Sequence, residues 1–573
     1  MKTLSTGAAA LALTALSLTM VQAQDTTELG PVVVTATRTP EPESQTLASV
    51  TVIDRAEIER RQARSVPDLL RGLAGVSVSG SGGPGQPSSV FVRGTDADQT
   101  LVLIDGVKVG GATLGSVQWE NLPVAQIERI ELVRGPRSSL YGSEAIGGVI
   151  QIFTRKGGGA LNPRASVGAG TYGTANGSLG LSGGGDKGWF NLEGSLEQTD
   201  GFNACNGRPE PFAGCGVFES DSDGYQNRSV SARAGYALHE RAEIDVHLLR
   251  TDNAVDFDGS PFSGNSARSS QQVLGASARL KPLDPWTLTL AAGRYWDKFR
   301  AFFQESFLDR FDTERDTLSL QNDIALAPEH LLTLGIDYRE DRVDGTVDYT
   351  EDSRDDTGVF GQYQGQWGGL DAKLSVRQDD DQQFGTQGTG NGAIGYRFSN
   401  GLRVAASYGT AFKAPTFNDL YFPFFVNPEL HTEQSRRAEL EVSGPLPAGL
   451  WSLNLYQTQI DDLIAFDPFT FQVDNIDQAR IRGLEAAARV AFGDWTLRGN
   501  LTLLDPENQS EGPNDGNLLP RRAEQTVNLD IDRRLGRWLF GGLGRAALRR
   551  PGQPGAARPL HPGEPPGRIR PDR

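Results

Sequence analysis

The chain has 573 residues, of which 38% are hydrophobic and 69 are glycines. Its formal net charge is −17. So acidic a protein lacks the basic surface that phosphate binding requires, which argues against nucleic acid as its main partner. Abundant glycine without leucine-rich stripes favours a protein built mostly of strands and turns.

The first 23 residues have the pattern of a secretion signal. Lys2 follows the first methionine, an apolar stretch runs from Ala8 to Val21, and Ala23 ends the sequence VQA. A basic start, a short apolar segment and small residues at the cleavage site are typical of exported proteins, so we expect cleavage after Ala23. No other apolar run reaches 18 residues, and no membrane-spanning helix is predicted.

A strand-like stretch, PVVVTATR, covers residues 31–38 and is followed by the polar, proline-containing TPEPESQ. Its β-branched residues favour a strand. Nothing adjacent offers a partner for its backbone groups.

Residues 41–158 predict a compact mixed α+β domain. SVPDLLRGLAG is expected to be a short helix with Ser65 as N-cap and Pro67 in its first turn, ending at Gly75. The runs SSVFVRG, TLVLIDGV and IERIELVRG then predict strands.

Alternating apolar and polar residues dominate the chain from about Asn162 onward. In FNLEGSLEQ, Phe190 and Leu192 fall on one face, and Asn191 and Glu193 fall on the other. A soluble β-sandwich shows the same period. Tryptophans at the ends of these runs and full charges on the polar face instead favour a transmembrane barrel, apolar outside and wet inside, whose sheet must close.

The linkers between these runs differ in length, as expected for a barrel with short turns on one side and long loops on the other. Residues 185–188 predict a short turn, and residues 199–227 and 252–270 predict long polar loops. Cys205 and Cys215 lie in the first long loop. In an exported chain we expect them to form a disulfide, with two free thiols as the alternative.

The composition changes after Phe540 and becomes rich in proline and arginine, which cannot pair as strands. We therefore predict a barrel over residues 159–540 and an aberrant tail over residues 541–573. Codons compatible with Ala547 to Asp572, read one nucleotide later, can encode an alternating, barrel-like string. The hypothesis is a frameshift between about Phe540 and Ala547.

Two stretches resemble the plug domain of TonB-dependent outer-membrane receptors: VFVRGTDADQTLVLIDGVKV (90–109) and IERIELVRGPRSSLYGSEAIGGVIQIFT (127–154). Segments similar to the barrels of that family follow at 406–421, 427–442 and 481–490. The resemblance covers about residues 28–540. It implies an all-β barrel of about 22 antiparallel strands in the bacterial outer membrane, with the α+β plug in its lumen. The altered tail implies that the C-terminal strands are lost in this chain.

The resemblance also implies active transport powered by TonB with ExbB and ExbD. Residues 24–40 then comprise the Ton box and its linker. The Ton box is a strand without a partner in its own chain, to which TonB adds a strand of its own. The Ton box candidates are Pro31, Val32, Val33, Val34, Thr35, Ala36 and Thr37.

Within the family, the plug motifs and RQDDDQQFGTQG (377–388) are most similar to those of cobalamin receptors. This implies cobalamin as the cargo of a monomer embedded in outer-membrane lipid. The alternatives are a ferric siderophore or another metal chelate as cargo, and a barrel that does not transport, such as an adhesin or a phage receptor.

The resemblance places residues 80–89 and 109–117 in apical plug loops that face the external medium. Glycine there lets the backbone approach a bulky ligand, and the first loop lacks the Lys-Ser/Thr of a P-loop. The ligand-binding candidates are Gln86, Ser88, Thr113 and Leu114, with ordinary turns as the alternative. The candidates for contacts with carboxylates of the barrel wall are Arg93, Arg134 and Arg137, with packing inside the plug as the alternative.

The segment FESDSDGY carries carboxylates at alternate positions without the later glutamate of an EF-hand. By resemblance, Asp221 and Asp223 match the calcium-binding residues of cobalamin receptors, and Asp256 matches more loosely. Asn203 and Asn265 stand where further carboxylates are expected, so a solvated acidic loop is the alternative. No catalytic motif is visible, and we expect neither enzymatic activity nor a catalytic cofactor.

Overall fold

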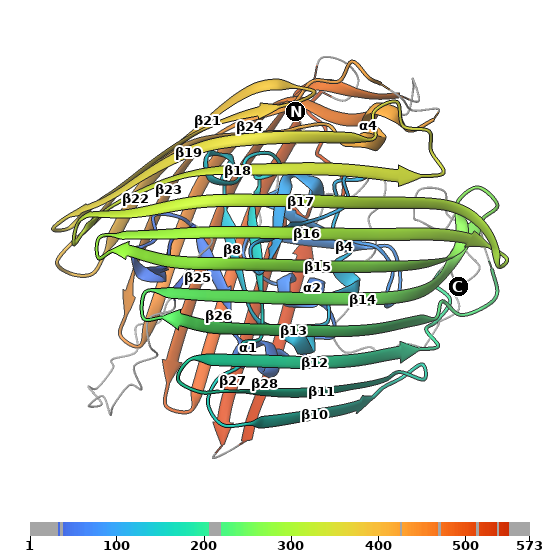
Figure 1. Cartoon of the computed structure of the whole chain (residues 1–573), viewed down its shortest axis with the longest axis horizontal. Helices are drawn as coiled ribbons and strands as arrows, with labels where there is room; N and C mark the ends of the chain where they lie inside the picture. The colour runs from blue at the N-terminus through green and yellow to red at the C-terminus, as the bar shows by residue number, and fades with distance from the viewer. Residues whose placement is uncertain are drawn as a thin grey trace, which may run out of the picture.

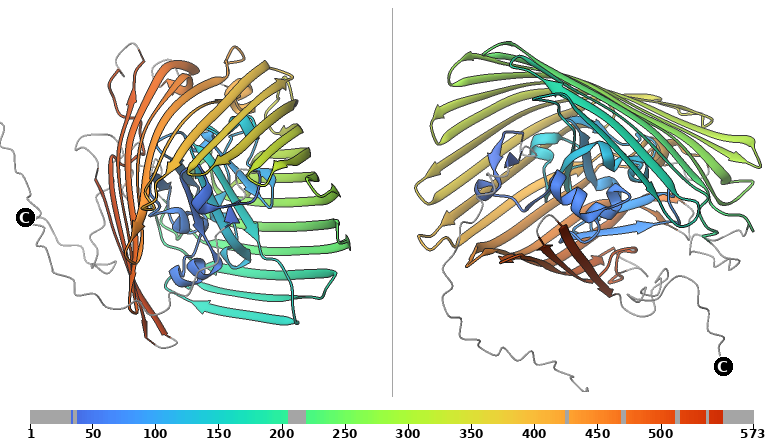
Figure 2. Two further views of the ribbon diagram at one scale, coloured as in Figure 1. Left: turned by 90° about the vertical axis from the view of Figure 1, so that its left-hand side faces the viewer. Right: turned by 90° about the horizontal axis from the view of Figure 1, so that it is seen from below.

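The computed structural model describes residues 33–34, 38–204, 219–423, 427–467, 472–510, 515–535 and 538–548. Two parts follow one another along the chain: a small plug and a 19-stranded antiparallel sheet that curves around it (Figures 1 and 2). The predicted signal peptide, both cysteines and residues 549–573 of the predicted tail lie outside the described residues.

The plug contains a five-stranded sheet in the order β3-β8-β9-β6-β7, in which β6 and β9 are parallel, and a separate β4-β5 hairpin. Its strands are β3 (Val50–Ile53), β4 (Val76–Gly80), β5 (Ser88–Val92), β6 (Thr100–Ile104), β7 (Val107–Val109), β8 (Ile127–Arg134) and β9 (Gly148–Thr154). Its helices are α1 (Arg55–Arg61), α2 (Val66–Leu70) and α3 (Ser138–Tyr141), with 3₁₀ turns η1 (Glu43–Gln45), η2 (Ala97–Gln99), η3 (Trp119–Asn121) and η4 (Val124–Gln126).

The predicted helix forms, but it is shorter than expected. Ser65 caps α2 by accepting a hydrogen bond from the Asp68 N–H, and Pro67 lies in the first turn. The helix ends at Leu70 instead of Gly75, because the Arg71 backbone turns to an extended conformation. Helix α1 was not predicted, although Asp54 caps it in the same way.

Two residues of the Ton box have a partner, contrary to the prediction; the other candidates, Pro31, Val32, Thr35, Ala36 and Thr37, lie outside the described residues. Strand β1 (Val33–Val34) pairs antiparallel with β2 (Glu41–Pro42) of the same chain. Arg38, three residues before β2, has a backbone φ of +66°. The sequence offered no adjacent strand, but two residues in each strand suffice for this short ladder.

The barrel wall has nineteen strands among the described residues, compared with the 22 that the family resemblance implies. They are β10 (Asn162–Ala169), β11 (Ala175–Gly184), β12 (Gly188–Thr199), β13 (Tyr225–His239), β14 (Ala242–Ser260), β15 (Gly264–Leu283), β16 (Trp286–Phe303), β17 (Ser306–Ala327), β18 (His330–Gly345), β19 (Ser353–Trp367), β20 (Leu370–Asp381), β21 (Gly385–Arg397), β22 (Arg403–Lys413), β23 (Glu433–Leu446), β24 (Gly449–Asp467), β25 (Gln472–Phe492), β26 (Trp495–Asn508), β27 (Gln525–Leu535) and β28 (Trp538–Leu548). A short helix, α4 (Phe417–Tyr421), lies between β22 and β23. Within the described residues, β10 and β28 are the two edges of the sheet.

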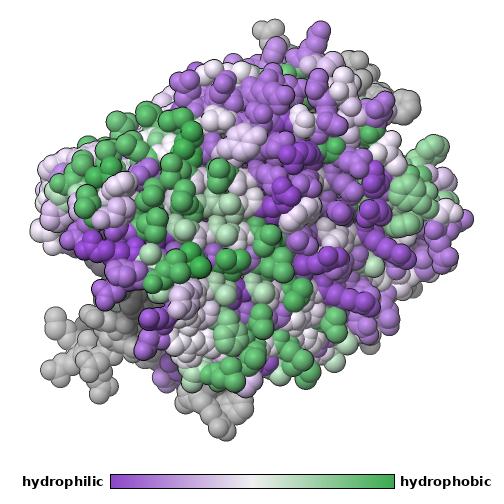
Figure 3. Space-filling view, viewed as in Figure 1, coloured by the Kyte–Doolittle hydropathy of each residue, from purple (hydrophilic) through white to green (hydrophobic). Residues whose placement is uncertain are grey.

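The predicted alternation is confirmed. In β12, Asn191 and Glu193 are buried toward the plug, whereas Leu192 and Leu196 are exposed on the outside. Figure 3 shows hydrophobic side chains gathered over one part of the outer strand surface and hydrophilic ones over the end that carries the longer loops. Among the described helices, none is long and apolar enough to cross a membrane.

Two predicted boundaries are wrong. Residues 252–270 belong mostly to β14 and β15, which meet at the tight turn 261–263, because polar segments pair readily where strands extend beyond the bilayer. Strand β28 pairs with β27 as far as Leu548, past the predicted end of the barrel at Phe540.

Candidate functional site

The apical loop at residues 81–87 lies at the end of the barrel that carries the longer loops. Gln86 is buried and donates from Nε2 to the Asp256 carbonyl (2.7 Å), and the Ser88 N–H donates to Glu120 Oε2 (3.3 Å). A Cβ at Gly85 would lie 2.1 Å from the Tyr225 ring, so the loop approaches the wall closely only because this residue is glycine.

The second apical loop, residues 109–117, is hydrogen-bonded to the long connection between β22 and β23. The backbone N–H groups of Phe417 and Asn418 donate to the carbonyls of Ala112 and Thr113, each at 3.1 Å. Thr113 is buried by this contact, whereas the neighbouring Leu114 is 64% exposed. Of the four ligand-binding candidates, Leu114 is therefore the one that presents a large free surface.

Arg93 makes the predicted contact between plug and wall. Its guanidinium donates to both carboxylate oxygens of Glu485 (2.7 and 2.8 Å) and to Glu439 (3.0 Å), and it lies 4.4 Å from the centre of the Tyr456 ring. Arg437 covers the same ring at 4.2 Å. We call these five residues the Arg93 cluster. Burial disfavours the charged guanidinium, but the two carboxylates outweigh it and raise the pKa of Arg93.

The other two predicted arginines bond within the plug, as the alternative interpretation has it. Arg134 donates to the Ala74 carbonyl (2.9 Å) and to Thr51 Oγ1 (2.9 Å), and Arg137 donates to the Pro136 carbonyl (3.2 Å). The prediction that these two side chains pair directly with wall carboxylates is therefore wrong. Both side chains donate instead to acceptors within the plug.

Sequence reasoning missed most of the ion pairs between plug and wall. They include Arg60 with Asp530 and Asp532, Asp96 with Arg522, Asp98 with Lys413, Asp105 with Arg233, and Glu144 with Arg339. Most of them place the carboxylate on the plug and the cation on the barrel, the reverse of the prediction. The alternating strands had indicated only that the lumen is charged.

The segment behind the Ton box is anchored to the wall. Arg38 donates to both oxygens of Asp337 (3.1 and 2.6 Å) and lies over the rings of Phe360 (4.3 Å) and Tyr141 (4.7 Å). Lys373 of β20 bonds Glu41 of β2. These contacts hold the β1-β2 pair at the barrel.

The predicted calcium residues are only partly brought together. Asp221 groups with Glu219 and Asp258, whose carboxylate oxygens lie within 4.8 Å of one another. Asp223 instead accepts a hydrogen bond from the Ala204 N–H (2.7 Å), and burial together with nearby carboxylates raises its pKa. Asp256 is not a member of the group. Asp258 was missed, and Glu219, although one of the alternating carboxylates of FESDSDGY, was not among the calcium candidates.

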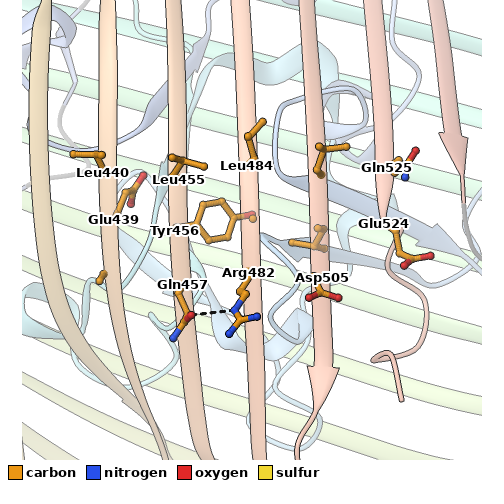
Figure 4. A pocket seen from close by; sticks show the side chains of 14 residues that line it. Glu439, Leu440, Leu455, Tyr456, Gln457, Arg482, Leu484, Asp505, Glu524 and Gln525 are labelled. Carbon is orange, nitrogen blue, oxygen red and sulfur yellow. Dashed lines mark hydrogen bonds between the residues drawn. The ribbon is translucent and has the colours of Figure 1, made fainter. Parts of the chain in front are cut away.

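A groove of about 800 Å³ runs across the neighbouring strands β23 to β27. Figure 4 shows Leu440, Leu455 and Leu484 along the strands, with Gln457 and Arg482 joined by a hydrogen bond. The three leucines are on the outward-facing positions of their strands, so the groove lies on the barrel exterior and is separate from the apical loops.

Residues 149–558 match the TonB dependent receptor-like β-barrel family, and residues 42–149 match the TonB-dependent receptor plug domain. The chain belongs to the TonB-dependent receptors. Its place is accordingly the bacterial outer membrane.

Curated relatives include the vitamin B12 transporter BtuB of Photobacterium profundum, 36% identical over 471 residues, which cover 80% of this chain and 76% of that protein. The vitamin B12 transporter BtuB of Vibrio cholerae is 34% identical over 517 residues, covering 86% and 80%. Among solved structures, the ferric enterobactin receptor PfeA of Pseudomonas aeruginosa matches with a TM-score of 0.74 at 17% identity, covering 88% and 86%. The siderophore receptor PirA of Acinetobacter baumannii gives 0.72 at 16%, covering 85% and 84%. At such identities the solved structures show the fold alone.

Proposed function

We propose that this chain binds cobalamin at its apical loops and carries it across the outer membrane in a TonB-dependent step. The observation that carries the proposal is the 34–36% identity to vitamin B12 transporters over most of both chains. The siderophore receptors are far less similar in sequence, and their likeness concerns the barrel and plug, which receptors for different cargos share.

The apical loops supply suitable chemistry for a bulky, partly apolar ligand. The exposed Leu114 offers apolar contact, and the half-buried Ser88 offers a hydroxyl. Gln86 is held by the wall and Thr113 by the first turn of α4, so we propose that they contact the ligand only after the loops rearrange.

The test is calorimetric titration of the purified chain with cyanocobalamin and with a panel of ferric siderophores. We expect saturable binding of cobalamin, weakened by Leu114→Asp. Binding of a siderophore with no response to cobalamin would transfer the proposal to the siderophore alternative. Binding without uptake in cells that contain TonB would favour a barrel that does not transport.

We propose that TonB, driven by ExbB and ExbD, pairs with residues 31–37 after ligand binding has displaced the β1-β2 pair. Strand addition to a short exposed strand gives main-chain hydrogen bonds without a preformed groove. The anchor at Arg38 supports this order, because the segment must leave Asp337 before it can reach a partner in the periplasm. A monomer suffices for this mechanism.

Calcium is proposed at Glu219, Asp221 and Asp258. The donor set fits a hard cation, because all three are carboxylates and Asp258 Oδ2 is buried without a hydrogen-bond partner among the described residues. Asn265 donates to Glu219 (3.0 Å), and the Glu219 N–H donates to Asp258 (2.8 Å). The segments that carry these residues are therefore already held close together. A bound calcium ion would neutralise the carboxylates and hold the loops together.

Calorimetry with calcium alone tests this site. We expect binding that is lost in Asp258→Asn and kept in Asp284→Asn, a substitution in the exposed turn between β15 and β16. An unchanged calcium titration for Asp258→Asn would contradict the assignment.

A further inference from the structure

Glu144 lies in the turn between α3 and β9, with a backbone φ of +80°. This left-handed conformation is unfavourable for a residue with a Cβ and persists only where its surroundings hold it. The holding contacts come from the barrel: the Glu144 N–H donates to the Phe412 carbonyl (3.2 Å), and the Ala414 N–H donates to Ser143 Oγ (3.0 Å). The turn is therefore fixed to the end of β22, where the loop that contains α4 begins.

The Glu144 carboxylate lies close to three cations. Lys108 of the plug is 3.3 Å away, and Arg339 and Arg315 of the wall are 3.5 and 3.9 Å away. Arg315 in turn donates from Nε to Asp341 at 2.5 Å. We call these five residues the Glu144 cluster. Burial disfavours the ionised carboxyl, but the three cations outweigh it and lower the pKa of Glu144, so it is charged.

Buried charges continue from this cluster to α4. Arg339 lies 4.0 Å from Asp381, and Arg354 lies 3.8 Å from the same carboxylate. Arg354 donates to the Pro415 carbonyl (3.0 Å), and its guanidinium lies 5.2 Å from the centre of the Phe417 ring. Phe417 begins α4 and bonds the second apical loop of the plug.

We propose that Glu144 is a positioning residue for transport, whose carboxylate keeps the outer half of the plug and the loop containing α4 together. The Glu144 cluster shares no residue with the Arg93 cluster, so the two are separate buried attachments of the plug to the wall. The inference rests on the proposed transport function, because only a plug that moves needs an attachment that can be released.

Hydrogen exchange of the purified full chain, without ligand, tests this role. In Glu144→Gln we expect the amides of Phe417 and Asn418 to exchange about tenfold faster. This acceleration is smaller than the full effect that losing one partner of a buried ion cluster can have. Glu144→Asp restores part of the protection because it keeps the charge. The control, Glu128→Gln, replaces a half-buried glutamate of β8 outside the cluster and leaves these amides unchanged.

The amide of Gly75, which donates to Thr502 Oγ1 beside the Arg93 cluster, serves as the internal reference. Acceleration at Phe417 and Asn418 but not at Gly75 supports the proposal. Equal acceleration at all three sites, or change confined to residues 142–147, overturns it. If Glu144→Gln fails to assemble, Lys108→Met removes the side chain nearest to the Glu144 carboxylate (3.3 Å) and is expected to give the same pattern. Because no ligand is added, a wrong cargo assignment leaves this result unaffected, whereas the cobalamin titration tests the cargo by itself.

Discussion

Replacing Arg93 by methionine removes a charge that the plug contributes to the barrel wall while keeping an unbranched side chain. Arg93 is 0% exposed and its main partner Glu485 is 2% exposed, with two short hydrogen bonds between them. Removing one partner of a buried ion pair costs about 3–5 kcal/mol, because the remaining charge keeps its desolvation penalty. Taking the lower value, the equilibrium for plug unfolding shifts about 150-fold.

Urea titration followed by pulsed hydrogen exchange at β6 and β8 measures this shift. With a slope of about 1.5 kcal/mol per molar urea, Arg93→Met lowers the midpoint of plug unfolding by about 2 M. Arg71→Met is the matched control, because Arg71 pairs with Asp68 in an exposed plug-internal bridge that contributes less than about 1 kcal/mol. A midpoint for Arg93→Met no lower than that of the control would refute the reasoning.

Three further predictions follow from the same contacts. Arg38→Ala loses the bidentate bond to Asp337, so a purified TonB C-terminal domain should bind the ligand-free receptor more tightly, which a pull-down titration measures. Deleting residues 31–38 should abolish uptake of labelled cobalamin while surface binding persists; retained uptake would contradict a role in coupling. Burial raises the pKa of Glu120 to about 8, so the folded plug binds this proton more tightly than the unfolded chain does. The stability of the plug therefore falls as the pH rises from about 4.5 toward 8. In Glu120→Gln the urea midpoint of plug unfolding should depend less on pH across this range.

The sequence predicted the architecture well because period-two alternation is a local signal. The buried Asn191 and Glu193 and the exposed Leu192 of β12 follow it directly. Strand ends were predicted poorly beyond the bilayer, because polar residues on both faces of β14 and β15 look like a loop when the neighbouring strand is not known.

The site was predicted less well because its contacts join distant parts of the chain. Arg93 and Arg134 stand in similar motifs, but only Arg93 faces the wall, and its partner Glu485 is 392 residues away. Nothing local distinguishes the two arginines. The same limit applies to Glu144, whose wall partners Arg315 and Arg339 belong to strands far along the chain.

The central claim is that the plug must move relative to the wall for cargo to pass. Ser139 of the plug and Ser375 of β20 lie with their Oγ atoms 2.8 Å apart, so Ser139→Cys with Ser375→Cys is suited to form a disulfide that ties the two parts together. Ser166→Cys with Ser178→Cys, which joins two strands within the wall across 2.7 Å, is the control. We predict that oxidation of the first pair stops cobalamin uptake, that reduction restores it, and that the control transports in both states. Undiminished uptake with the plug tied to the wall would contradict the account.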